Sequence, residues 1–393
     1  MGRLPDGRAV FVPNTLPGEL ARVRLVEQKR GHARAELLEV VEASPDRIPP
    51  ETPGGEPCPG CHYQHMPYAL QLSAKDAILK EQLERLGGVV DPPLLPPIPS
   101  PKIWNYRNHI QLHMDDQGRL GYHEARSNQV IAIQSDPLAE EPLNEVRAQL
   151  DLEPVAGLER ISLRLGMEDD ILLVLEASQP GAPGLSVEDL DVSAVYVSPG
   201  GQFVMAGSEH IFMQAAGRDY KVSAQSFFQV NSLQAGRMLT YLLGRLPLER
   251  HASVLELYSG VGLFSAFIAP RVERLVAIES SPSATADFVE NLDEFDNVEL
   301  YEAPVEQALP ALDLKPGLVL ADPPRSGLGA KTIPHLLALE APVLAYISCD
   351  PATLARDAAR LARGGYRLEE ITLIDMFPQT YHIESLSLWR LEG

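Results

Sequence analysis

The sequence predicts an α/β protein whose carboxyl-terminal part holds an open sheet, preceded by a mixed domain and a small barrel. Three apolar runs of strand length support the sheet, at residues 253–258, 274–279 and 318–321. Each run ends at a feature suited to a ligand: a glycine pair, a carboxylate and an Asp-Pro-Pro turn, respectively. Because open α/β sheets bind ligands at the carboxyl ends of their strands, we expect a functional site along this edge.

Residues 1–48 predict a small β-barrel of the OB type. Strand patterns at residues 8–12, 19–26 and 33–41 alternate with turn-rich segments. Such barrels bind single-stranded nucleic acid on one face; the alternative is a barrel that only packs on the catalytic domain. Through position 35, basic residues outnumber Asp6, Glu19 and Glu27; they are Arg3, Arg8, Arg22, Arg24, Lys29, Arg30 and Arg34.

Residues 49–101 predict a linker that contains a Cys-x-x-Cys pair and one helix. The helix is expected over residues 70–86 and ends at Gly87-Gly88. Its predicted apolar face lies at positions 70, 74, 77, 78, 83 and 86. Residues 91–101 are rich in proline, and we expect them to form a connector.

Residues 102–215 predict a central α+β domain, with alternating apolar residues at 161–165 and 171–175. Its expected role is to position RNA. Trp104 and Tyr106 are candidates for stacking on bases. The candidate residues of an RNA-binding groove are Lys102, Arg107, His109, His113, Arg119 and Arg126.

The chain has 393 residues, more than one domain usually has, and a formal net charge of −21. This charge is unfavourable for general phosphate binding, so it predicts a defined basic groove on an acidic body. With no apolar stretch long enough for a bilayer and no signal-peptide core, we expect a cytoplasmic protein without a membrane partner. Separately, we expect a monomer. Three cysteines predict thiols in a reducing compartment rather than a disulfide framework.

Gly260 and Gly262 follow the strand pattern at residues 253–258. Glycines at such a turn let the backbone approach a ligand that lies over the sheet edge. Glu279 ends the next strand pattern, in the position that accepts hydrogen bonds from ribose hydroxyls. Ser265 stands where a nicotinamide-binding loop would want a third glycine, so the loop favours an adenosyl ligand without a pyrophosphate.

Cys349 and Glu384 are the candidate catalytic pair. Cys349 follows a short apolar run at residues 343–345, and Glu384 lies in a turn-rich segment before a final strand. A thiol and a carboxylate can carry out covalent attack on a ring followed by removal of a proton. Asp322, at the end of a third strand, is expected beside Cys349 if their strands are neighbours. The alternative is a buried structural cysteine and a surface glutamate.

Together these stretches resemble the RNA uracil-C5 methyltransferase family. The N-terminal segment resembles the TRAM module, which occurs in several RNA-modifying enzymes. The matching motifs occur in the family order. They are Ser-Phe-Phe-Gln-Val-Asn at 226–231, Glu-Leu-Tyr-Ser-Gly-Val-Gly at 256–262, Glu279, Asp-Pro-Pro-Arg at 322–325, Ser-Cys-Asp-Pro-Ala-Thr-Leu at 348–354 and Asp-Met-Phe-Pro-Gln-Thr-Tyr-His-Ile-Glu at 375–384.

The resemblance implies a class I methyltransferase fold over residues 216–393 that binds S-adenosylmethionine. It also implies that Cys349 is the nucleophile and Glu384 the general base. Two positions depart from the family pattern. Asp350 replaces the usual amide, where its charge would raise the pKa of the thiol, and Leu263 replaces a polar contact of some relatives. The residues implied to contact the cofactor or shape its pocket are Gln229, Tyr258, Gly260, Gly262, Glu279 and Asp322.

The implied partner is RNA, and three interpretations of the function remain open. The first is methylation of uridine carbon 5 in 23S ribosomal RNA, favoured because bacterial tRNA-specific relatives commonly lack the N-terminal barrel. The second is the same chemistry on tRNA, and the third is a catalytically silent RNA-binding factor. Cytosine methylation is less favoured, because such enzymes usually carry a second cysteine near the Asp-Pro-Pro segment, and this chain has none there.

Cys58 and Cys61 indicate a possible metal site, since some relatives hold an iron–sulfur cluster with four cysteines around this motif. Thr52 stands where the first cysteine would be, and Asp136 aligns with the fourth. Because a cluster needs four good ligands, we expect no iron–sulfur cluster. Zinc held by the two cysteines and His65 would lack one clear ligand, so we predict a metal-free remnant.

Overall fold

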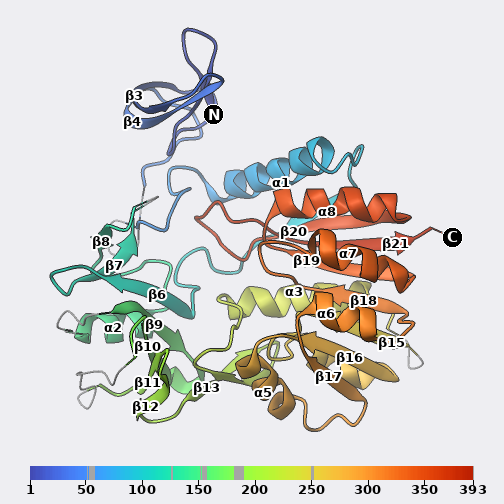
Figure 1. Ribbon diagram of the computed structural model, residues 1–393. Coiled ribbons are helices and arrows are strands. Elements are labelled where there is room, and N and C mark those ends of the chain that lie inside the picture. The colour runs from blue at the N-terminus through green and yellow to red at the C-terminus, as the bar shows by residue number, and fades with distance from the viewer. Residues whose placement is uncertain are drawn as a thin grey trace.

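The computed structural model describes residues 1–50, 52, 58–124, 127–150, 152, 157–180, 190–248 and 252–392. Their strands form sheets of four, seven and eight strands and one two-stranded hairpin. In Figure 1 the four-stranded sheet lies at the top, the seven-stranded sheet at the lower left and the eight-stranded sheet at the right.

The eight-stranded sheet carries the carboxyl-terminal half of the chain. Its order is β17 (Val298–Glu302), β16 (Arg274–Glu279), β15 (Ser253–Leu257), β18 (Leu318–Ala321), β19 (Val343–Ser348), β21 (Glu384–Leu391), β20 (Tyr366–Ile374) and β5 (Leu94–Ile98). Strands β15 to β19 are parallel, and β21 is antiparallel to both its neighbours. The chain order reverses at β15, and such a switch point opens a crevice for ligands at the carboxyl ends of the strands.

Helices cover both faces of this sheet, which is why its central strands are mostly apolar. One face packs against α1 (Tyr68–Arg85), α6 (Val305–Ala308), α7 (Gly329–Ala338) and α8 (Pro351–Arg363). The other packs against α3 (Ser232–Arg245), α4 (Ser265–Ile268), α5 (Pro282–Asn291) and the hairpin of β13 (His210–Ala215) and β14 (Arg218–Ser223).

The strands expected at residues 253–258, 274–279 and 318–321 are confirmed as β15, β16 and β18. The short apolar run before Cys349 is confirmed as part of β19. The carboxyl ends of these strands therefore meet where the candidate catalytic residues were expected.

The connector expected at residues 91–101 is wrong in part, because Leu94–Ile98 form strand β5. This strand lies at the edge of the large sheet and pairs in parallel with β20. Pro96 and Pro97 lack an N–H, and an edge strand tolerates them because only one of its sides is hydrogen bonded.

The helix expected at residues 70–86 is confirmed as α1, but its buried face differs from the predicted one. Ala77 and Leu86 are exposed. Lys75 instead turns inward and pairs with Asp375 at 2.6 Å, with both side chains fully buried. The buried residues lie one turn apart along the helix: Gln71, Lys75, Leu79 and Leu83.

The central domain is a seven-stranded sheet with one helix, α2 (Glu141–Gln149), packed against it. Its order is β12 (Gly201–Ala206), β11 (Ser193–Ser198), β10 (Ile171–Ala177), β9 (Leu158–Leu165), β6 (His109–Met114), β7 (Leu120–His123) and β8 (Val130–Ala132). The alternation noted at 161–165 and 171–175 falls on β9 and β10, which are buried at the centre of this sheet.

The N-terminal sheet has the order β1 (Gly2–Arg3), β2 (Ala9–Phe11), β4 (His32–Glu42) and β3 (Leu20–Gln28), and it confirms the three predicted strands. Its core is small, with Val10, Ala33 and Ala35 buried. Most of the predicted basic surface is compensated by exposed ion pairs, which join Arg8 to Asp6, Arg22 to Glu39, Arg24 to Glu36, and Lys29 and Arg34 to Glu27.

Within the described ranges, no helix is both long and apolar enough to cross a bilayer.

Candidate active site

Cys349 and Glu384 meet at one end of the large sheet. Strands β19 and β21 pair antiparallel with Ser348 opposite Ser385, and one further step in this register sets Cys349 opposite Glu384. Cys349 is half-buried and Glu384 is 6% exposed. The structure therefore brings together the two predicted catalytic residues, and the glutamate is not the surface residue of the alternative interpretation.

Asp322 lies beside this pair, as expected, because β18 and β19 are parallel neighbours with Ala321 opposite Tyr346. Arg325, three residues further, donates a hydrogen bond from Nη2 to Nδ1 of His382 at 2.7 Å. This bond links the loop after β18 to the segment that precedes Glu384. We call that segment, residues 375–383, the catalytic loop.

The acidic groups and the thiol shift one another's protonation. Burial, and then the nearby carboxyls of Glu384 and Asp322, raise the pKa of the Cys349 thiol to about 11, while Arg325 opposes this rise. Burial and the charge of Asp322 raise the pKa of Glu384 well above its usual range. Burial raises the pKa of Asp322 to about 7. Strong shifts of this kind cluster at catalytic sites.

Asp350 has a structural partner that the sequence did not indicate. It is the N-cap of α8, and its side chain accepts a hydrogen bond from the N–H of Thr353 at 2.7 Å. The carboxyls that raise the pKa of the Cys349 thiol are those of Glu384 and Asp322, rather than that of Asp350 as the sequence suggested. As an N-cap, this side chain satisfies one of the backbone N–H groups that the first turn of a helix leaves without a partner.

The loop after β15, residues 258–262, forms the second part of the site, and we call it the cofactor loop. Glu279 at the end of β16 accepts a hydrogen bond from the N–H of Gly260 at 2.9 Å. Its other carboxylate oxygen accepts from the N–H groups of Ser280 at 2.7 Å and Ser281 at 2.8 Å. Glu279 thus shapes the loop from the neighbouring strand.

Three residues of the cofactor loop have positive φ angles: Tyr258 at 63°, Gly260 at 55° and Gly262 at 91°. A Cβ atom on Gly260 would meet open space, whereas one on Gly262 would come within 2.3 Å of Leu292 Cδ1. Gly260 therefore leaves room for a ligand, and Gly262 permits close packing against the segment after α5. An open backbone turn beside a carboxylate fits the ribose of an adenosyl group.

Gln229 lies in a loop, residues 223–231, that runs from the end of β14 to the start of α3 and is hydrogen bonded to the central domain. Asn108 of the central domain donates to the Gln229 carbonyl at 3.0 Å. Buried Arg164 of β9 donates to the carbonyls of Ser223 at 2.9 Å and Ser226 at 2.7 Å. These buried polar bonds fix the loop at the junction of the two domains.

Phe227 in the same loop was missed by the sequence analysis as a candidate. Its side chain is 66% exposed, although its neighbours Ser226 and Phe228 are buried. An exposed aromatic ring two residues before Gln229 can stack on an unpaired base. The signal in the sequence is weak: two phenylalanines stand side by side in a loop motif, and here only Phe228 is buried.

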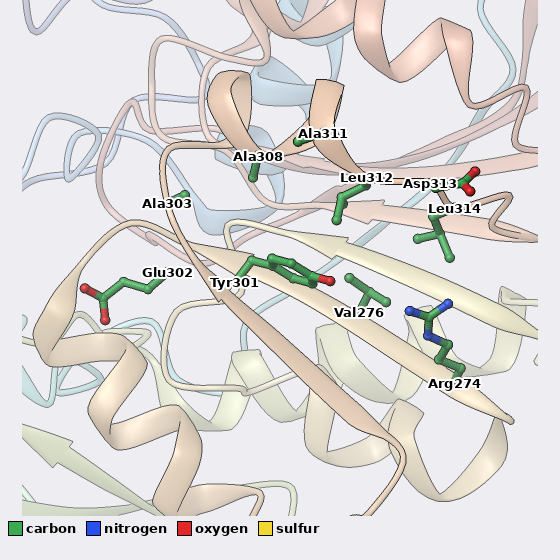
Figure 2. Close-up of a pocket in the computed structure, with 10 residues that line it drawn as sticks. All are labelled: Arg274, Val276, Tyr301, Glu302, Ala303, Ala308, Ala311, Leu312, Asp313 and Leu314. Atoms are coloured by element: carbon green, nitrogen blue, oxygen red, sulfur yellow. The ribbon is translucent and has the colours of Figure 1, made fainter.

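A cavity of about 380 Å³ lies elsewhere on the catalytic domain (Figure 2). It is bounded by Arg274, Val276 and Tyr301 of β16 and β17 and by the segment from Ala308 to Leu314. None of the predicted site residues lines it. The candidate reacting groups lie instead at the end of the sheet where the carboxyl ends of the parallel strands meet.

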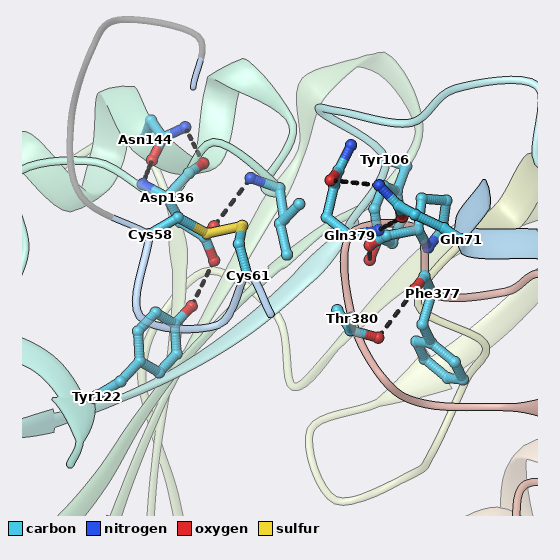
Figure 3. The surroundings of a disulfide bond; sticks show 12 residues. Cys58, Cys61, Gln71, Tyr106, Tyr122, Asp136, Asn144, Phe377, Gln379 and Thr380 are labelled. Atoms are coloured by element: carbon cyan, nitrogen blue, oxygen red, sulfur yellow. Dashed lines mark hydrogen bonds between the residues drawn. A yellow bond between two sulfur atoms is a disulfide. The ribbon is translucent and has the colours of Figure 1, made fainter. Parts of the chain in front are cut away.

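Cys58 and Cys61 form a disulfide, which corrects the expectation of free thiols. Two cysteines separated by two residues can be bridged within a single turn, and here their Cα atoms are 5.3 Å apart. Figure 3 shows Asp136 in the surroundings of the bond, where it accepts from Tyr122 at 2.5 Å. Across the described part of the chain, no three His, Cys, Asp or Glu side chains are grouped to hold a metal.

The predicted RNA groove needs correction at two positions. Tyr106 is 2% exposed and its hydroxyl donates to the Pro378 carbonyl at 3.1 Å, so it is unavailable for stacking on a base. Burial lowers the pKa of His109 to about 3, so this side chain is uncharged at neutral pH. Lys102 and Arg119 each face a carboxylate, and Arg126 lies outside the described residues.

Known proteins resemble this chain in sequence and in structure. A family profile described as tRNA (uracil-5-)-methyltransferase matches residues 185–390, and one described as the TRAM domain matches residues 1–38. An uncharacterized RNA methyltransferase of Streptomyces coelicolor is 32% identical over 99% of this chain and 89% of its own. One of Aquifex aeolicus is 33% identical over 98% of this chain and 93% of its own.

A solved structure is similar along its whole length. The tRNA (uracil-54, C5)-methyltransferase of Pyrococcus abyssi, in complex with S-adenosyl-L-homocysteine, has a TM-score of 0.74 and is 25% identical, covering 98% of both chains. These matches confirm the fold predicted for the N-terminal barrel and for the carboxyl-terminal domain.

Proposed function

Because the chain belongs to the tRNA (uracil-5-)-methyltransferase family, we propose that it methylates carbon 5 of an RNA uridine through a covalent Cys349 adduct. Membership makes it an S-adenosylmethionine-dependent RNA methyltransferase. The covalent route is the proposed part. The observation that carries it is the register of β19 and β21, which sets Cys349 opposite a buried Glu384.

The residue types match the demands of the reaction. Carbon 5 of uracil is too weak a nucleophile to take a methyl group directly, and attack of the Cys349 sulfur on carbon 6 gives an enolate with electron density at carbon 5. Once carbon 5 has taken the methyl group from the sulfonium of the bound cofactor, Glu384 accepts the carbon 5 proton, carbon 5 and carbon 6 regain their double bond, and the cysteine leaves as thiolate. When bound, S-adenosylmethionine supplies the electrophilic methyl group.

The cofactor loop supports binding of S-adenosylmethionine. Glu279 is placed for ribose hydroxyls, and Gly260 leaves room above the backbone. We propose the same cofactor surface for Tyr258, Gly262, Gln229 and Asp322, which follow from the sequence motifs. No metal is part of this proposal.

Arg325 has a defined place in the proposed chemistry. The free thiol is protonated at neutral pH, since its pKa is about 11, and it must lose that proton to attack. Arg325 is the cation whose charge lowers the pKa of both Cys349 and Glu384. We therefore assign it the role of favouring thiolate formation among acidic neighbours.

The substrate proposed first is 23S ribosomal RNA, on the ground that the chain carries an N-terminal barrel. The second candidate is tRNA, supported by the full-length similarity to the Pyrococcus abyssi tRNA enzyme, which covers 98% of both chains. Labelled S-adenosylmethionine with separate unmodified 23S and tRNA transcripts, followed by nucleoside analysis, separates them. Transfer to tRNA alone would reject the first candidate, and binding without transfer to either would favour a silent RNA-binding factor.

The covalent step has its own test. RNA with 5-fluorouridine at the target site cannot release a carbon 5 proton, so with cofactor it should trap the protein as an adduct stable in detergent. The Glu384→Gln variant should accumulate the corresponding adduct on ordinary RNA, with hydrogen in place of fluorine at carbon 5, and its turnover should be reduced by about 10²- to 10⁴-fold. The control is the same RNA without fluorine, which must serve as a substrate. If the fluorinated form of that RNA gives no adduct, the covalent route is rejected.

A further inference from the structure

The catalytic loop has no regular secondary structure, yet it must hold Glu384 in place. Gln379 at its centre is 4% exposed and has a φ angle of 66°, a left-handed conformation that is unfavourable for residues other than glycine. Thr380 beside it is fully buried. Interactions from outside the loop must therefore maintain this conformation.

Three consecutive backbone carbonyls of the loop accept hydrogen bonds from the segment that precedes β6. Lys75 Nζ donates to the Phe377 carbonyl at 2.9 Å, and the Tyr106 hydroxyl donates to that of Pro378 at 3.1 Å. The Gln379 carbonyl accepts from the N–H groups of His62 at 2.7 Å and Tyr63 at 3.0 Å. His62 and Tyr63 directly follow the disulfide turn.

Gln71 of α1 makes the most specific of these contacts (Figure 3). Its Oε1 accepts from the N–H of Gln379 at 3.0 Å, and its Nε2 donates to Gln379 Oε1 at 2.9 Å. The same Nε2 lies 3.2 Å from the carbonyls of Tyr63 and Met66. A buried amide is suited to this position because it donates and accepts at once, and its 1% exposure leaves water no access to replace it.

We propose that Gln71 is a positioning residue for the base Glu384. Resting on the proposed function, this inference assigns to α1 the task of fixing the catalytic loop. Gln71 does not touch the reacting atoms and acts through Gln379. Loss of its hydrogen bonds should let Glu384 depart from the geometry needed to take the proton, while leaving the attack of Cys349 intact.

Gln71→Met tests the proposal, because methionine keeps the length of the side chain and removes both hydrogen-bonding groups. We expect kcat to fall by about 10- to 100-fold, as for a base displaced by a fraction of an ångström to an ångström, with the KM for RNA little changed. Proton removal should become more rate-limiting, so the isotope effect from deuterium at carbon 5 should rise and an adduct should accumulate on ordinary RNA. The rate of adduct formation with 5-fluorouridine RNA should stay at the wild-type value.

Gln82→Met is the matched control, since Gln82 lies on the same helix and takes no part in these contacts. Equal kcat and equal isotope effects in the two variants would overturn the proposal. A parallel fall in fluorinated-adduct formation and turnover for Gln71→Met would overturn it as well, because the damage would then be general. Gln71→Glu, which keeps an acceptor and when protonated a donor, should recover part of the activity.

A second variant decides the matter if Gln71→Met does not fold. Tyr106→Phe removes one hydroxyl from the same set of contacts, and we expect a smaller effect in the same direction, a fall in kcat of a few-fold with a raised isotope effect. An unchanged isotope effect in a folded Tyr106→Phe would refute positioning by this segment. Wild-type protein that forms no adduct on fluorinated RNA would instead reject the proposed function, and this inference with it.

Discussion

The cofactor loop and the catalytic loop lie at the same edge of one sheet, but different parts of the chain hold them. The cofactor loop is fixed by its own domain: Glu279 binds Gly260, and Asn291 donates to the Val261 carbonyl at 3.0 Å. The catalytic loop is fixed by residues about three hundred positions earlier, such as Gln71. One half of the site is thus a local product of the α/β fold, and the other depends on long-range contacts.

The largest expected effect comes from Cys349→Ala. Turnover should be abolished, because the other two cysteines of the chain are joined in a disulfide and cannot replace the thiol, and fluorinated RNA should no longer be trapped. If the two halves of the site are independent, titration calorimetry should give an S-adenosylmethionine affinity close to that of the wild type. Product released at an undiminished rate would contradict the assignment of the nucleophile.

Next in size is Lys75→Met, which leaves the fully buried Asp375 without its partner. Breaking one side of a buried ion pair typically costs about 3–5 kcal/mol, which urea unfolding would measure. The double variant Lys75→Met/Asp375→Leu should recover much of this loss because no charge remains buried. As a contrast, Arg22→Ala, which breaks an exposed pair with Glu39, should cost under about 1 kcal/mol.

The cofactor side has a pH-dependent stability of its own. Burial raises the pKa of Glu256, on β15, to about 8 from an ordinary value of 4.5. The folded state therefore holds a proton that the unfolded chain has lost, so this contribution to stability is complete below pH 4.5 and disappears as the pH rises to 8.

Glu256→Gln should flatten this part of the stability profile, by a few kcal/mol at most across the range. Urea unfolding at a series of pH values measures it. The difference in unfolding free energy between variant and wild type should shift in favour of the variant as the pH rises. A pH-independent difference would mean that Glu256 does not carry a proton in the folded state.

The smallest effect is expected from Cys58→Ser/Cys61→Ser. The bridge closes a loop with a sequence separation of only 3, so removing it should lower the free energy of unfolding by about 2 kcal/mol at most. His62 and Tyr63 follow the bridge and bind the catalytic loop, so kcat should also fall. The fall should be smaller than in Gln71→Met. A reducing agent added to the wild type should reproduce the change. If neither the free energy of unfolding nor kcat changes, the bridge does not help to hold the catalytic loop.

The same contrast explains what the sequence could and could not predict. Strands β15, β16 and β18 were predictable because their apolar runs and terminal residues are local signals. Cys349 and Glu384 could be named as candidates from their motifs, which lie at the ends of β19 and β21, two strands that are neighbours in the sheet but not in the chain. The inward face of α1 was not predictable, because a lysine and a glutamine are buried only where distant partners satisfy them.

Two further differences have the same origin. Strand β5 looked like a connector because prolines are scarce in strands, and only its place at a sheet edge makes them acceptable. From the sequence, Tyr106 was a candidate for stacking on a base. Only the tertiary structure reveals that its hydroxyl donates a hydrogen bond to the Pro378 carbonyl. A sequence pattern reports on the segment in which a residue lies. Whether a polar side chain can be buried depends on its hydrogen-bond partner, which can lie far away in the sequence.

The hydrogen bonds to the Phe377, Pro378 and Gln379 carbonyls define where this protein can be recombined with its relatives. A chimera joined near residue 48 would exchange the barrel and leave every one of these bonds within one parent. A junction between residues 107 and 215 would take the donors from one parent and the acceptors from the other. In a chimera, helix α1 must therefore come from the same parent as the catalytic loop, whereas the barrel can be exchanged.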